Sequence, residues 1–170
     1  MKKGLFFLCG LILLACQETE SVNEVTDFTG NETTYLLQQA SDYAVNGTIL
    51  FKEKKDGTTI ANVQLNGTDG TLKYPVHLHL GNIATPNAEV ALLLSPVNAD
   101  NGKSETIITH LADDSSVTYQ QLIGMEACIK IHLAESGPDR DVILAGGNIG
   151  KSSLKEATSG RIGFSVCKSE

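Results

Sequence analysis

The chain has 170 residues and a net charge of −7, with no tryptophan and only 5% aromatic residues. An acidic chain of this kind lacks the basic footprint that nucleic-acid binding needs, so nucleic acid is not an expected partner. The length suffices for one domain with its own core, which must consist mainly of Val, Ile and Leu. Composition specifies no oligomeric state.

The N-terminus combines two lysines, an apolar run from Leu5 to Ala15, and then Cys16. This run is too short to span a bilayer and is typical of the hydrophobic part of an export signal. The ending Leu13-Leu14-Ala15-Cys16 resembles the lipobox of bacterial lipoproteins. The resemblance implies cleavage before Cys16 and lipidation of its side chain. The alternative is an ordinary signal peptide followed by a cysteine by chance.

This interpretation divides the chain into a signal peptide over residues 1–15, an acidic tether over 16–33 and one domain over 34–170. The lipid would anchor the protein in the cell envelope, on the periplasmic or surface face of the outer membrane. Because the envelope is oxidising, we expect a disulfide between Cys128 and Cys167. The alternative is a pair of buried thiols.

Short apolar runs separated by turns follow the tether. Asp56-Gly57 favours a hairpin turn, because this pair tolerates the positive φ that tight turns require. Residues 118–122 are suited to one helical turn, and 134–160 is predicted to be a long loop. The pattern predicts an all-β protein, an antiparallel sandwich or closed barrel. The expected strands cover residues 43–52, 59–65, 74–80, 89–97, 105–111, 127–133 and 161–166.

The chain contains four histidines, and two of them form His77-Leu78-His79. Residues two apart in a strand point to the same face, so both imidazoles can contact one metal ion. His132 lies on the polar face of another predicted strand and could join them. Three imidazoles suit copper, zinc or nickel and leave a position for water or substrate. His110 is a further candidate ligand, and the alternative for it is a solvated side chain at a strand end.

Five segments in order resemble the copper–zinc superoxide dismutases: 45–51, 76–79, 129–134, 141–148 and 159–164. Together they span roughly residues 44–167. The resemblance implies a Greek-key β-sandwich or flattened barrel that binds copper and acts on superoxide.

By the same resemblance, His77, His79 and His132 occupy copper-ligand positions, and Arg161 is the catalytic arginine that guides the anion. Asp139 or Asp141 loosely matches a carboxylate that supports the ligands. Residues 81–88 replace the family's long loop and contain no histidine, so its bridging histidine is missing and no zinc site is expected.

The short loop also resembles the chordin-type (CHRD) domains, which have a His-x-His followed by Gly, a Thr-x-x-Leu turn and a late histidine. The stretches 75–81 and 118–122 fit this description. Two functions are therefore expected. The first is an envelope lipoprotein that binds a metal ion, copper above all, with weak or no dismutase activity. The second is a non-catalytic CHRD-like lipoprotein without metal, whose histidines are surface residues.

Overall fold

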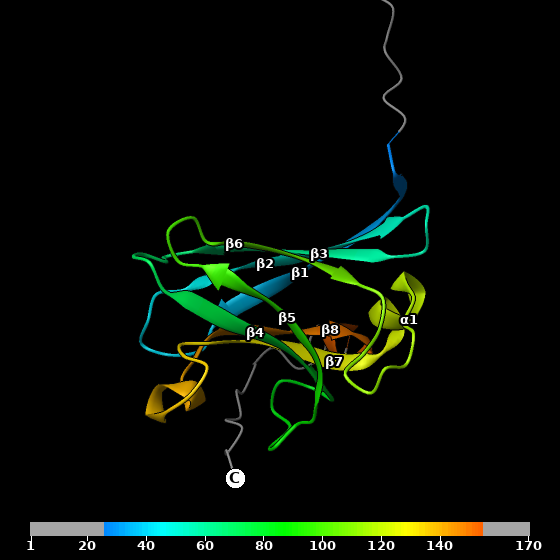
Figure 1. The fold of residues 1–170 in the computed structure, drawn as a ribbon. Coiled ribbons are helices and arrows are strands. Elements are labelled where there is room, and N and C mark those ends of the chain that lie inside the picture. The colour runs from blue at the N-terminus through cyan, green and yellow to red at the C-terminus, as the bar shows by residue number, and fades with distance from the viewer. Residues whose placement is uncertain (1–25, 155–170) are drawn as a thin grey trace, which may run out of the picture.

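Eight β-strands form the part of the chain that the computed structural model describes, residues 26–154 (Figure 1). One short α-helix precedes the seventh strand, and a 3-10 turn precedes the eighth. The elements are β1 (Phe28–Gln39), β2 (Asn46–Lys54), β3 (Thr59–Asn66), β4 (Lys73–Leu80), β5 (Val90–Asn98), β6 (Lys103–Ile108), α1 (Tyr119–Gly124), β7 (Glu126–His132), η1 (Pro138–Asp141) and β8 (Ile143–Gly150).

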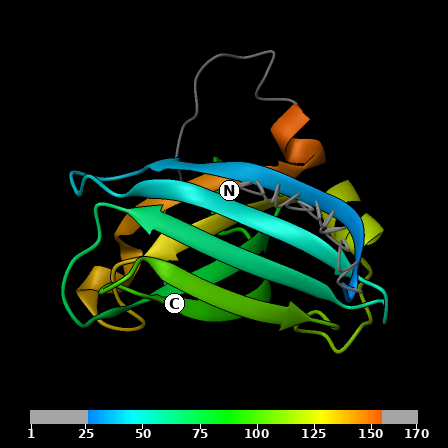
Figure 2. The same ribbon diagram turned by 90° about the horizontal axis from the view of Figure 1, so that it is seen from above.

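The strands close into an antiparallel barrel in the order β1-β2-β3-β6-β5-β4-β7-β8. β4, β5 and β6 follow one another as hairpin neighbours, and β7 returns to pair with β4, which is a Greek-key arrangement. Figure 2 shows β1, β2, β3 and β6 lying side by side across one wall of this flattened barrel. The predicted all-β, antiparallel, flattened barrel is confirmed.

The barrel interior holds the apolar side of each strand. Ile49 and Phe51 of β2 and Leu78 of β4 are fully buried there, as are Ile129 and Ile131 of β7. Alternation along these strands directs the intervening residues outward. A core of branched aliphatic side chains with few aromatics agrees with the composition.

Two local predictions are confirmed. Gly57 has a φ of +87° in the turn between β2 and β3, where the Lys54 amide donates to the Thr58 carbonyl oxygen. The helical turn predicted at residues 118–122 is α1, and Thr118 caps its N-terminus by accepting from the Gln121 amide. The Thr118 amide in turn donates to Oε1 of Gln121, which completes a capping box.

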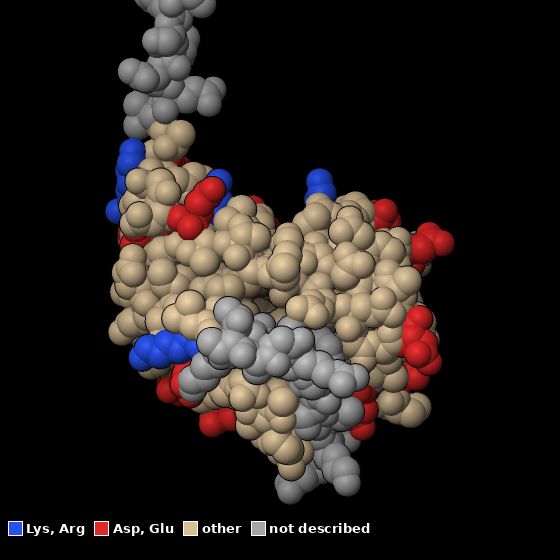
Figure 3. Space-filling view, turned by 180° about the vertical axis from the view of Figure 1, so that it is seen from behind, with Lys and Arg blue, Asp and Glu red and all other residues tan. Residues whose placement is uncertain are grey.

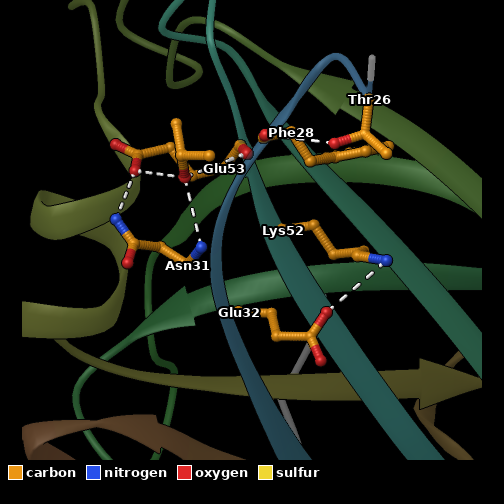
Figure 4. Close-up of polar contacts among 7 residues, drawn as sticks. Thr26, Phe28, Asn31, Glu32, Lys52 and Glu53 are labelled. Atoms are coloured by element: carbon orange, nitrogen blue, oxygen red, sulfur yellow. Dashed lines mark hydrogen bonds and ion pairs between the residues drawn. The ribbon is translucent and has the colours of Figure 1, made fainter. Parts of the chain in front are cut away.

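β1 begins at Phe28, six residues before the predicted start of the domain at residue 34. The Glu53 carboxylate of β2 accepts hydrogen bonds from Thr29 and Asn31 at 2.9 and 2.7 Å, and Lys52 pairs with Glu32 at 3.5 Å (Figure 4). Residues 28–33 therefore belong to the barrel. Residues 29–32 are exposed and mostly polar, as in a linker, which is why sequence analysis places this segment in the tether.

The prediction of a long loop over residues 134–160 is wrong, because η1 and β8 lie within this range. Every residue of β8 is buried, so the strand shows no apolar–polar alternation. Gly147 sits where a Cβ would collide with the Leu36 carbonyl oxygen of β1. The close approach of two backbones explains a Gly-Gly pair in a strand, although such a pair ordinarily indicates a loop.

Several predictions concern residues outside the described range. These are the signal peptide, Cys16, Arg161, the strand predicted at 161–166 and Cys167. Among the described residues, no helix is long and apolar enough to cross a membrane. Figure 3 shows one face of the molecule, where acidic side chains lie around the edge and basic ones occupy isolated positions.

Candidate metal centre

β4 positions the first two histidines on the outer face of the barrel. Val76 and Leu78 of this strand are buried in the core, so His77 and His79 point to the opposite side. Their ring centroids are 5.8 Å apart. The His-x-His pair thus presents both imidazoles on one surface, as the sequence predicts.

β7 brings the third histidine to the same surface. Val76 pairs with Ile131 and His77 pairs with Lys130, so His132 is a diagonal neighbour of His77 across the two strands. The ring centroids of His77 and His132 are 4.6 Å apart, and those of His79 and His132 are 6.2 Å apart. Antiparallel pairing of β4 with β7 therefore joins residues more than fifty positions apart in the sequence.

The three side chains form a group that could hold a metal ion. One ring nitrogen from each of His77, His79 and His132 lies within 4.8 Å of the others. Two nitrogens bound to one ion at about 2.0–2.1 Å lie at most about 4 Å apart. In tetrahedral coordination the separation is about 3.4 Å, so binding would draw the most widely separated ring nitrogens together by up to about 1.4 Å.

Backbone carbonyl groups hold two of the rings in a defined state. Nδ1 of His79 lies 2.8 Å from the Ala88 carbonyl oxygen, and Nδ1 of His132 lies 2.8 Å from that of Arg140. A carbonyl oxygen only accepts, so each Nδ1 carries the hydrogen, and in a neutral ring Nε2 keeps its lone pair. Nε2 of His132 is buried and has no hydrogen-bond partner among residues 26–154. This orphaned nitrogen is in the protonation state that metal coordination requires.

The surroundings keep the imidazoles neutral. Burial, followed by the charges of neighbouring groups, lowers the pKa of His77 to about 4. Burial also lowers the pKa of His79 to about 4, against a smaller raising effect of the Ala88 carbonyl. The pKa of His132 is lowered for the same main reason. Protons therefore compete little for these nitrogens at neutral pH.

A cavity of about 190 Å³ adjoins the three rings. Its remaining wall comes from the end of the 81–88 loop, the first residue of β5 and the loop after β7. Asp141, one of the two carboxylates expected near the ligands, lies in this wall, whereas Asp139 does not line the cavity. The lining residues besides the histidines are Asn87, Ala88, Val90, Arg140 and Asp141.

The sequence did not single out Ala88 or Arg140. Both contribute through a backbone carbonyl oxygen, and every residue has one, so no side-chain pattern could identify them. The available signal was the position of two short loops directly after the histidine-bearing strands.

The other candidate residues lie elsewhere. His110 is exposed beside an isolated bridge to Ser116 and does not belong to the group of three. Cys128 is buried on β7, while its predicted disulfide partner Cys167 falls outside the described residues. The predicted anion guide, Arg161, also falls outside them.

Comparison with known proteins identifies no relative. The chain matches no family model, no curated protein and no solved structure.

Proposed function

We propose that the protein is an envelope lipoprotein whose barrel binds a transition-metal ion, preferably copper, through His77, His79 and His132. The observation that carries this proposal is the convergence of three imidazoles, two of them held by carbonyl oxygens with Nε2 left as the lone-pair nitrogen.

The donor set favours copper or zinc over hard cations. Neutral imidazole is a good ligand for both ions, whereas magnesium and calcium require oxygen ligands. At equal availability a nitrogen site binds Cu²⁺ more tightly than Zn²⁺, following the general order of divalent affinities. Three protein ligands leave a coordination position open toward the cavity.

Each residue has a separate role in this proposal. His77, His79 and His132 donate to the ion, and the carbonyl groups of Ala88 and Arg140 orient two of the rings. A bound copper ion would supply one-electron chemistry. Low dismutase activity is expected for two reasons. The chain has no counterpart of the dismutases' bridging histidine, and an acidic protein repels an anionic substrate.

Metal analysis of the purified full chain tests the proposal. We expect about one copper ion per chain after exposure to equimolar Cu²⁺ and Zn²⁺, and a large increase in thermal stability on adding copper. At a ligand concentration a thousandfold above Kd, binding stabilises the folded state by about 4 kcal/mol.

The double variant His77→Ala/His79→Ala should lose both effects. His110→Ala is the matched control, because this exposed histidine lies outside the group. Equal copper binding by the double variant and the wild type would refute the proposal. A wild type without stoichiometric metal would instead support a non-catalytic, CHRD-like lipoprotein. Superoxide removal by the loaded protein then measures any catalysis.

A further inference from the structure

Three outward side chains, starting with His79 of the metal centre, form a row across the barrel wall. His79 of β4 pairs with Cys128 of β7, and Cys128 pairs with Asn148 of β8. His79, Cys128 and Asn148 are all buried, although they lie on the outer face. The loop of residues 81–88, which connects β4 to β5, lies over this row.

The loop is bound to both ends of the row. Its last residue, Ala88, accepts at its carbonyl oxygen from Nδ1 of His79 at 2.8 Å. Its third residue, Ile83, donates its amide to Oδ1 of Asn148 at 2.6 Å. Both contacts are buried, and the Ile83 side chain is 2% exposed. In a site shielded from water, such bonds are strong, and losing one partner leaves a buried polar group unsatisfied.

Other bonds hold the two ends of the loop: the Leu80 amide donates to the Glu89 carbonyl oxygen at 2.9 Å, and Ser152 Oγ donates to the Gly81 carbonyl oxygen at 3.4 Å. Thr85 and Asn82 bond to each other, which maintains the shape of the turn but does not tie it to the sheet. Gly81, at the start of the loop, donates its amide to the Glu126 carbonyl oxygen of β7. The Asn148 side chain therefore attaches the middle of the loop to the barrel wall.

We propose that Asn148 is a positioning residue for the metal centre. It holds the 81–88 loop so that the Ala88 carbonyl oxygen keeps His79 in the Nδ1–H tautomer, in which Nε2 carries the lone pair. The effect of Asn148 on metal binding rests on the function proposed above, whereas the effect of Asn148 on the His79 tautomer does not. Partners that orient a ligating histidine commonly change metal affinity by about 10- to 100-fold when removed.

Nuclear magnetic resonance on the metal-free, full-length chain tests the first step. Long-range ¹⁵N–¹H correlations of the His79 ring should show the Nδ1–H tautomer in the wild type. In Asn148→Ala they should show exchange between the two tautomers, and the Ile83 amide should exchange faster with solvent. Asn148→Asp retains an acceptor oxygen and is expected to restore the wild-type pattern.

Copper titration of the same variants tests the second step. We expect the affinity of Asn148→Ala to fall by about tenfold, the lower end of the range for groups that orient a ligand. Ile149→Val is the matched control, since Ile149 is the next residue of β8 and lies in the barrel core. It should lower the melting temperature without changing the tautomer or the affinity.

The outcomes separate the two proposals. A wild-type tautomer of His79 in Asn148→Ala, or equal losses of affinity in Asn148→Ala and Ile149→Val, would overturn the positioning role. A wild type that shows the tautomer but binds no copper would overturn the proposed function and leave the positioning role supported.

Discussion

The two sides of the barrel differ in which faces of their strands are buried. On the side formed by β1, β2, β3 and β6, most outer residues are exposed or half-buried, and β1 and β6 have one buried residue each. On the side of β7 and β8, all residues except Glu126 are buried. Yet two of the outer residues of β7, Lys130 and His132, are polar.

The two walls therefore differ in where the barrel buries polar side chains. Hiding polar groups from water is costly unless they are hydrogen-bonded, so a wall with a covered polar outer face needs partners for them. The 81–88 loop and the segment around Arg140 supply carbonyl groups to His79 and His132. The side with solvated outer residues serves as a scaffold, and the covered side carries the candidate site.

Adding one methyl group to β8 should have the largest effect on the fold. We expect Gly147→Ala to lower the free energy of unfolding by about 3 kcal/mol, because its Cβ meets the Leu36 backbone of β1. Gly124→Ala is the control, since nothing lies within 4 Å of a Cβ there. It should be neutral or slightly stabilising. Urea denaturation of both variants measures the difference, and equal effects would contradict the close packing of β1 on β8.

Two neighbouring residues of β7 should separate metal binding from stability. His132→Ala is expected to weaken copper binding by about a hundredfold, or about 2.8 kcal/mol, at least the loss typical of residues that only orient a ligand. Ile131→Val removes a core methylene on the opposite face, which costs about 1 kcal/mol of stability. It should leave copper affinity unchanged. Isothermal titration would decide, and comparable affinity losses would mean that the two faces of β7 are not independent.

Lowering the pH should reduce the stability of the metal-free protein through the histidines of the covered side. The unfolded chain protonates its histidines near 6.5, whereas His77 and His79 in the folded state do so only near 4. Between these values the unfolded state binds more protons, so the stability of the metal-free protein falls as the pH drops through this window. Thermal unfolding from pH 7 to pH 4 measures the decrease. A His77→Ala/His79→Ala variant should show a flatter profile, and an equally steep one would contradict the assignment.

The smallest effect is expected on the solvated side. Glu32 of β1 and Lys52 of β2 form an ion pair of 3.5 Å with both side chains partly exposed. Exposed pairs of this kind contribute little, so Glu32→Ala should change the free energy of unfolding by about 0.5 kcal/mol or less. A loss above about 1 kcal/mol, measured by the same denaturation, would show that this wall is less tolerant than proposed.

Local signals explain what sequence analysis predicted well. Strict alternation from Tyr74 to Leu80 and from Ala127 to Leu133 predicted two strands with their histidines on one face, and Asp56-Gly57 predicted the first hairpin. β8 was missed because it is buried on both faces and contains Gly146-Gly147, so neither alternation nor propensity marks it as a strand.

The sequence by itself determined the all-β class and the outward direction of His77, His79 and His132, because both depend on the two-residue period of a strand. Only the tertiary structure decided that β4 pairs with β7 in a register that brings His132 beside His77. It also decided which carbonyl groups orient the rings. Strand pairing and loop placement follow from the packing of the whole barrel, and a carbonyl oxygen has the same chemistry in every residue.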